Sequence, residues 1–238
     1  MTGKLNLSKS LRLAVLQTGR SIDEAIEEHG DYDEMCKALM LRGPTEADTF
    51  PVLEGVFPSS LEPYDVFIIT GSKHGVYEDH DWLAPLESMI RDIFAANKKL
   101  IGICFGHQII AKALGGEVAK SDRGFGVGVM DYQVTDGRGV KHPIALYAWH
   151  QDQILTPPPN AETIASSDFC KYAGLRYGDC ALTFQPHPEF TSDYVRLLAE
   201  ARRGAVISEI QADAAIASLE RDVDAELVQA MIFDFVNQ

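Results

Sequence analysis

Cys104 lies in the segment GICFG, which has the form G-x-C-x-G and ends the apolar run KLIGIC. A helix-like segment, HQIIAKAL, follows it directly. A buried strand, a tight turn between glycines and a helix together expose a nucleophile at the carboxyl end of an α/β sheet. The helix N-terminus favours a thiolate and can hold an oxyanion. Because cysteine is also among the most buried residue types, this segment alone leaves a packing role open.

A working nucleophile needs a base, and the base needs a group that orients it. The late segment LTFQPHPEF supplies both types, in His187 and Glu189. Prolines on each side of the histidine stiffen the backbone, and residues i and i+2 of an extended segment lie on the same side. We therefore predict that Glu189 fixes the tautomer of His187 and that both act with Cys104.

The first half of the chain must position these groups through alternating strands and helices. Apolar β-type runs occur at Leu11–Leu16, Asp65–Thr70 and Lys99–Cys104, and a short strand is expected around Thr49–Leu53. Helical spacing marks Asp33–Leu41 and, more clearly, Leu83–Lys98. Continuous apolar strands alternating with helices predict an open, mostly parallel sheet with helices on both faces, an α/β fold.

The sequence pattern changes after Gly116. Short β-type pieces separated by Gly, Pro and Asp predict added β-hairpins, and residues 191–238 read as mostly helical. We see no repeat or linker, and we expect a single domain over residues 1–238.

Composition narrows the class of protein. The 238 residues carry a net charge of −14, which argues against nucleic-acid binding. No apolar run approaches the roughly 20 residues of a membrane helix, and Leu11–Leu16 is too short for a signal peptide. The four cysteines form no C-x-x-C pair and the seven histidines no H-E-x-x-H pattern, so we expect a cytoplasmic protein without a metal.

Together, GICFGHQIIAKALGG and FQPHPEF resemble the class I, or triad, glutamine amidotransferase family, over residues 11 to about 195. The resemblance implies a flavodoxin-like sheet, with Cys104 as nucleophile, His187 as general base and acid, and Glu189 as its partner. It also implies an oxyanion hole made of backbone N–H groups at Phe105 and near Gly71 and Ser72. The family turn usually has two glycines and a proline, whereas this chain reads Gly71-Ser72-Lys73.

The same resemblance implies substrate-binding residues. Gln108 corresponds to a family glutamine that lines the substrate pocket, and WHQDQI resembles a loop that contacts the amino-acid head of glutamine. The implied contacts are His150, Gln151 and Asp152, although many members have glycine at the position of Gln151. The form of this loop looks more like the free-standing branch of the family, which includes γ-glutamyl peptidases.

The expected reaction releases ammonia from the side chain of glutamine through a γ-glutamyl thioester on Cys104. It needs no metal or organic cofactor. The chain has no G-x-x-x-x-G-K-[ST] motif, so a separate synthetase partner uses the ammonia, or no acceptor exists. The alternative is a γ-glutamyl peptidase or amidase acting on γ-glutamyl peptides.

The same residues argue against two other classes of protein. A Pfp-like cysteine hydrolase or chaperone shares the elbow cysteine but lacks the late H-P-E segment. A binding protein with a silent site does not need intact Cys104, His187 and Glu189. Of the other histidines, we expect His107 to pack in the core. His74, His80 and His142 show no partner pattern, and we expect them to be surface residues.

Overall fold

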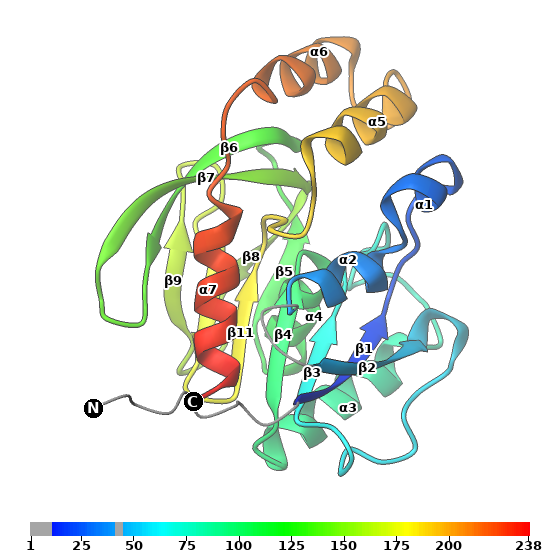
Figure 1. Ribbon diagram of the computed structural model, residues 1–238, viewed down its shortest axis with the longest axis vertical. Coiled ribbons are helices and arrows are strands. Elements are labelled where there is room, and N and C mark those ends of the chain that lie inside the picture. Colours follow the sequence, from blue (N-terminus) through cyan, green and yellow to red (C-terminus); the bar gives the residue numbers. More distant parts are fainter. Residues whose placement is uncertain (1–10, 41–44) are drawn as a thin grey trace, which may run out of the picture.

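The structure is a computed structural model that describes residues 11–40 and 45–238 (Figure 1). Its described residues form a nine-stranded sheet, in the order β2-β1-β3-β4-β11-β10-β9-β6-β7, and a two-stranded sheet of β5 and β8. The strands are β1 (Leu11–Gln17), β2 (Thr45–Pro51), β3 (Val66–Ile69), β4 (Lys99–Ile103), β5 (Glu117–Lys120), β6 (Gly126–Thr135), β7 (Lys141–His150), β8 (Asp152–Thr156), β9 (Glu162–Ser166), β10 (Gly174–Tyr177) and β11 (Ala181–Phe184).

Half of the large sheet is parallel, as the apolar runs predict. Strands β2, β1, β3, β4 and β11 pair in parallel, and the last pair sets Ile103 opposite Phe184. The carboxyl ends of β4 and β11 are therefore neighbours. This register brings Cys104, which follows β4, close to the segment that carries His187.

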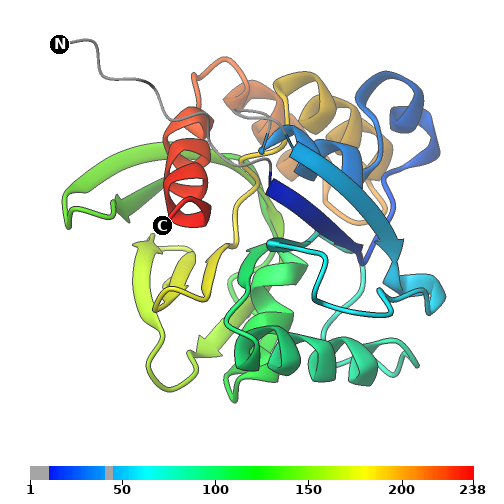
Figure 2. The same ribbon diagram turned by 60° about the horizontal axis from the view of Figure 1, so that its bottom comes forward.

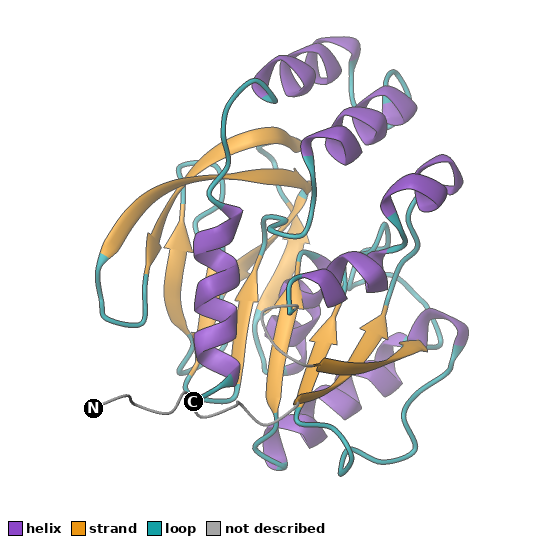
Figure 3. Cartoon of the chain, viewed as in Figure 1, coloured by secondary structure: helices purple, strands orange, loops and turns teal. Residues whose placement is uncertain are grey.

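The other half is antiparallel. Strand β10 joins β11 and β9, and the long hairpin of β6 and β7 extends the edge. The change of direction confirms the added hairpins expected after Gly116. Figure 3 shows these long strands curving away from the parallel strands.

Helices cover both faces of the parallel half (Figure 2). Alternate residues of each strand face opposite sides, so Ile68 belongs to the same buried apolar cluster as residues of α7, whereas Ile69 belongs to a second cluster that contains residues of α3. The helices are α1 (Asp23–His29), α2 (Tyr32–Ala38), α3 (Leu83–Ala95), α4 (Phe105–Ala113), α5 (Ser192–Arg202), α6 (Glu209–Ser218) and α7 (Ala225–Val236), and a short 3₁₀ helix spans Val52–Glu54.

Some predicted boundaries were wrong by a few residues. The helix expected over Leu83–Lys98 ends at Ala95, because Asn97 has a φ of 51°, a left-handed conformation that a helix cannot continue. The strand expected around Thr49–Leu53 begins earlier, at Thr45, where its pairing with β1 begins. The C-terminal region is helical as predicted.

No helix in the described ranges has both the length and the apolar character needed to cross a membrane. Residues 1–10 lie outside the described residues, as does Leu41 at the end of a predicted helix.

Candidate active site

Cys104 occupies a sharp turn between β4 and α4. Its backbone has φ 52° and ψ −101°, a conformation that non-glycine residues rarely adopt. The flanking glycines make the turn feasible. A Cβ atom on Gly106 would lie 2.3 Å from the carbonyl oxygen of Ile69, and one on Gly102 would lie 2.7 Å from that of Gly106. The strained elbow expected from the sequence is therefore present.

Cys104 lies at the start of α4, and the residue is only 6% exposed. Phe105 is the first residue of α4, so its N–H group is among those that a helix leaves without an internal acceptor. The Sγ atom is 3.9 Å from the carbonyl oxygen of Trp149, at the limit of a weak hydrogen bond. The surroundings thus offer a helix N-terminus beside a shielded thiol.

His187 is held on several sides. Its Nδ1–H donates to Glu189 Oε1 at 2.7 Å, and its backbone N–H donates to the carbonyl oxygen of Tyr147 at 2.8 Å. The ring of Phe190 stacks on the imidazole at 4.0 Å between centroids. The side chains of His187 and Glu189 are 4% and 3% exposed. The imidazole therefore has a fixed position and a fixed tautomer.

The edge of the His187 imidazole that faces away from Glu189 lies near Cys104. No N or O atom in the described part of the chain bonds the buried Nε2 of His187. A Cβ atom built on Gly71 would lie 3.5 Å from Cε1 of His187 and 3.9 Å from Cβ of Cys104. Burial lowers the pKa of His187, but the charges of Glu189 and Cys104 outweigh it and raise this pKa to about 10. The site thus favours the protonated imidazole of His187.

The turn at Gly71 and Ser72 is positioned by Thr18, which the sequence analysis missed. The Thr18 hydroxyl is 2.9 Å from the carbonyl oxygen of Thr70 and 3.1 Å from that of Gly71, both of which can accept its proton. The Ser72 hydroxyl donates in return to the carbonyl oxygen of Thr18 at 2.7 Å. Thr18 follows the carboxyl end of β1, and that position at the ligand-binding edge was the available signal.

The structure brings together Gln108, His150 and Asp152. The Gln108 amide donates to the carbonyl oxygen of Asp152 at 2.9 Å and to Gln185 Oε1 at 3.0 Å. His150 Nδ1 lies 3.2 Å from the same carbonyl oxygen of Asp152. Burial and the charge of His187 lower the pKa of His150 to about 3, so its imidazole is neutral.

Some polar groups that the family resemblance implies for substrate binding already have hydrogen-bond partners within the protein. The carboxylate of Asp152 accepts the hydroxyl of Tyr77 at 3.0 Å, and the carbonyl oxygen of Gln151 accepts the backbone N–H of Ser121 at 3.2 Å. Substrate binding by Gln108, His150, Gln151 and Asp152 stays a prediction.

His74, His80 and His142 are partly exposed, as expected, and have partners that no sequence pattern indicated. His74 and His80 both contact the carboxylate of Glu78, and His142 Nε2 lies 3.1 Å from Asp136 Oδ2. These partners lie in loops, where no periodic spacing reveals them. His107 is buried with hydrogen bonds on both ring nitrogens, as a core residue should be.

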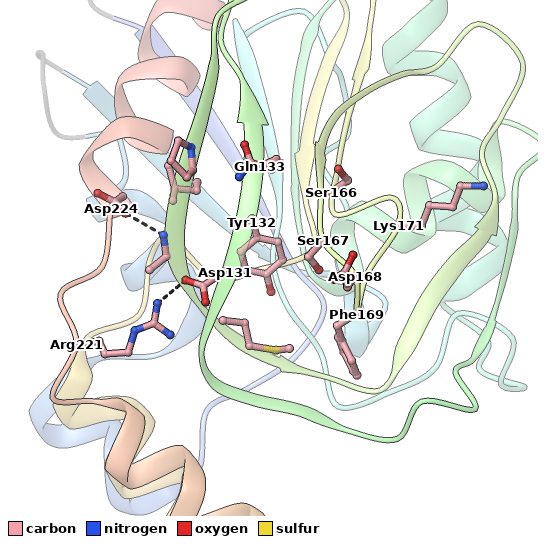
Figure 4. Close-up of a pocket in the computed structure, with 14 residues that line it drawn as sticks. Asp131, Tyr132, Gln133, Ser166, Ser167, Asp168, Phe169, Lys171, Arg221 and Asp224 are labelled. Atoms are coloured by element: carbon pink, nitrogen blue, oxygen red, sulfur yellow. Dashed lines mark hydrogen bonds and ion pairs between the residues drawn. The ribbon is translucent and has the colours of Figure 1, made fainter.

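A cavity of about 840 Å³ is lined by residues of β6, of β7 and of the segment that ends β9 and follows it (Figure 4), and Cys104, His187 and Glu189 are not among its lining residues. Phe169 lines it, and the ring of Phe169 is 5.7 Å from that of His150. Tyr132 also lines it, with a buried hydroxyl that has no hydrogen-bond partner within residues 11–40 and 45–238. Arg221, paired with Asp131, and Lys171 add charge to its rim.

Chemically, the arrangement contains what acyl transfer requires. It has a thiol on a strained turn, an imidazole with a free Nε2, a carboxylate on Nδ1 and backbone N–H groups at a helix start. The metal-ligating side chains that lie together in the described residues, His74, Glu78 and His80, are a separate group.

Comparison with known proteins gives a consistent result. Residues 47–196 match the sequence profile of glutamine amidotransferase class-I. Gamma-glutamyl peptidase 4 of Arabidopsis thaliana is 30% identical over 227 residues, which cover 90% of each chain. A glutamine amidotransferase-like protein of Schizosaccharomyces pombe is 29% identical over 94% of this chain and 98% of its own.

More distant relatives extend the comparison. The glutamine-hydrolysing GMP synthase of Pyrobaculum aerophilum is 35% identical over 57% of this chain and 26% of its own. The crystal structure of a glutamine amidotransferase from Thermotoga maritima superposes with a TM-score of 0.79, at 21% identity, and covers 97% of this chain and 100% of the other. That structural likeness supports the α/β fold.

Proposed function

The chain belongs to the class I glutamine amidotransferase family, and from this premise we propose that it hydrolyses the γ-glutamyl amide bond of γ-glutamyl peptides. The observation that carries the proposal is the similarity to a γ-glutamyl peptidase over 90% of both chains, with Cys104, His187 and Glu189 gathered at one edge of the sheet. This reaction is the alternative that the sequence left open beside glutamine hydrolysis.

Acylation begins when the Cys104 thiolate attacks the γ-carbonyl carbon and forms a C–S bond. The backbone N–H groups of Phe105 and of the Gly71-Ser72 turn hold the oxyanion. As the C–N bond breaks, His187 Nε2–H passes its proton to the leaving amine. The products of this step are a γ-glutamyl thioester and a free amine or peptide.

Deacylation uses the same groups in reverse. Nε2 of neutral His187 removes a proton from water, and the resulting hydroxide attacks the thioester carbonyl. The C–S bond breaks, glutamate leaves, and the thiolate–imidazolium pair is restored. Glu189 stays ionised throughout and holds the Nδ1–H, as the carboxylate of a triad does.

Glutamine hydrolysis is the second candidate. It is favoured by the likeness to an amidotransferase-like protein and to a GMP synthase that is named as glutamine-hydrolysing. The present chain matches only 26% of that synthase, so a separate synthetase partner would receive the ammonia in this case.

A substrate panel separates the candidates. Glutamine, a γ-glutamyl anilide and a γ-glutamyl tripeptide are supplied at equal concentration, and released ammonia, aniline and dipeptide are measured. We expect kcat/KM to be highest for the tripeptide. A preference for glutamine over both other substrates would replace the first candidate with the second.

Two cysteine variants control this panel. Cys104→Ala should abolish turnover of every substrate, whereas Cys180→Ala, which removes a partly exposed thiol next to Asn97, should leave it unchanged. Undiminished turnover by Cys104→Ala would exclude both candidates.

A further inference from the structure

The loop between β3 and α3 carries a compact group of metal-ligating side chains that the proposed reaction does not use. His74 Nδ1 lies 3.3 Å from Glu78 Oε2, and His80 Nε2 lies 2.8 Å from the same oxygen. The three ligand atoms all lie within 4.8 Å of one another. We propose that His74, Glu78 and His80 bind a divalent transition-metal ion of the zinc class.

The distances are compatible with such an ion. Zinc bonds to imidazole nitrogen and carboxylate oxygen are about 2.0–2.2 Å long, so tetrahedral ligand atoms stand roughly 3.3 Å apart. The pair formed by His74 and Glu78 already has this separation, at 3.3 Å. Small side-chain rotations that move Glu78 away from His80 complete the set. Three protein ligands then leave a fourth position for water.

The ligand types select the metal. Two imidazoles and one carboxylate suit zinc and its neighbours in the first transition row, whereas calcium and magnesium prefer oxygen ligands.

The surroundings hold the two imidazoles and leave access to them. The ring of His80 stacks on Trp82 at 5.8 Å with an interplanar angle of 15°, and the rings of His74 and His80 are 4.4 Å apart. A surface cavity of about 720 Å³, lined by His74, His80, Asp81 and others, borders the group. An ion can reach the ligands from solvent through this cavity.

The site is tied to the catalytic turn. The backbone N–H of His74 donates to the Ser72 hydroxyl at 3.2 Å, and the Tyr77 hydroxyl donates to Asp152 Oδ1 at 3.0 Å. An ion bound by residues 74 to 80 restrains the loop between these two contacts. Its effect on turnover rests on the proposed function, whereas the binding itself does not.

Metal binding is best measured in Cys104→Ser protein, because cysteine sulfur and imidazole nitrogen, as at Cys104 and His187, are ligand types that zinc also binds. Metal-free protein is dialysed against Zn²⁺ and titrated with Co²⁺. We expect one Zn²⁺ per chain and the visible bands of four-coordinate Co²⁺, without thiolate-to-cobalt charge transfer. Stability of the protein to heat should rise with Zn²⁺.

Ligand variants decide between a metal site and a simple hydrogen-bonded cluster. Glu78→Gln and His80→Gln should each weaken Zn²⁺ binding by about 100-fold and remove the cobalt bands. His142→Gln is the matched control, because His142, like His80, pairs with a carboxylate. The two side chains are also similarly exposed, at 32% for His142 and 30% for His80. Thermal unfolding of the metal-free variants checks that each one folds.

The proposal is overturned if Cys104→Ser protein retains no Zn²⁺, or if Glu78→Gln and His80→Gln bind it as tightly as their parent. Equal weakening by His142→Gln would likewise contradict it. None of these measurements depends on turnover, so failure of the metal site and failure of the peptidase proposal give separate results.

Discussion

The Nδ1 atom of His187 lies 2.7 Å from Oε1 of Glu189, and both side chains are almost completely shielded from water. In such a setting a carboxylate strongly favours the protonated imidazole. Burial opposes protonation of His187, and Glu189 is the largest of the interactions that outweigh burial and raise its pKa. The pair therefore controls both the tautomer of His187 and its readiness to donate a proton.

Glu189→Gln tests this control. The amide has nearly the same shape but no charge, so the pKa of His187 should fall from about 10. We expect kcat to fall by roughly 10²–10⁴-fold, and the alkaline limb of the pH–rate profile to move to lower pH as the imidazolium is lost earlier. Measurement of kcat and of kcat/KM between pH 5 and 10.5 shows both effects.

A matched substitution shows whether charge loss in general is responsible. Glu200→Gln removes a carboxylate that pairs with Arg203 on the surface, and it should leave the pH profile unchanged. An alkaline limb at the same pH in Glu189→Gln as in the parent would contradict the role of Glu189.

Gly106→Ala tests the packing of the elbow. The new methyl group would meet the Ile69 carbonyl oxygen at 2.3 Å, which forces the start of α4 away from β3. We expect the free energy of unfolding to fall by about 1–3 kcal/mol, and turnover to fall with it because Cys104 moves. Urea unfolding and kcat are the measurements. Gly137→Ala, at a position where nothing lies within 4 Å, should change neither.

Thr18→Val tests how the Gly71-Ser72 turn is positioned. Valine keeps the shape of the side chain but cannot donate to the carbonyl oxygens of Thr70 and Gly71. Loss of an oxyanion donor costs about 10²–10³-fold in kcat, and a displaced donor should cost less, roughly tenfold. Thr18→Ser should restore kcat, and KM should change little in both. If valine and serine variants lost the same activity, the hydroxyl would not be the cause.

Local sequence signals were sufficient to predict the turn at Cys104 and the pairing of His187 with Glu189. The glycines around Cys104 required a strand-to-helix turn, and the i, i+2 spacing of His187 and Glu189 required one shared side of an extended segment. Their approach to Cys104 depends on one further condition, that β11 lies next to β4. No local signal shows this pairing, and the family resemblance implied only that the three residues act together. The roles of these residues, and the single domain over residues 1–238, stay predictions.

Other contacts depended on tertiary structure that has no local signal. Thr18 and Ser72 are 54 positions apart and meet because β1 and β3 are parallel neighbours. His74, Glu78 and His80 lie in a loop, where side-chain direction follows no period. The order of the antiparallel strands was also unpredictable, since pairing such as that of β6 with β9 depends on long-range contacts rather than on composition.

Two buried histidines predict how stability changes with pH. Burial lowers the pKa values of His107 and His150 to about 3, from an ordinary value of 6.5. Because these pKa values are depressed in the folded protein, the unfolded chain takes up the protons first as pH falls below 6.5. Their contribution to stability is therefore complete above pH 6.5 and is lost progressively toward pH 3.

Each histidine should add about 1.4 kcal/mol per pH unit to the decline in unfolding free energy within this window. His107→Gln removes one of the two proton-binding groups and can keep a hydrogen bond to the carbonyl oxygen of Tyr172. We expect its stability to decline less steeply between pH 6 and 4.5, whatever its stability at pH 7. Urea unfolding at several pH values measures this slope. An unchanged slope would mean that His107 is already protonated in the folded protein, or that its proton uptake is matched on unfolding.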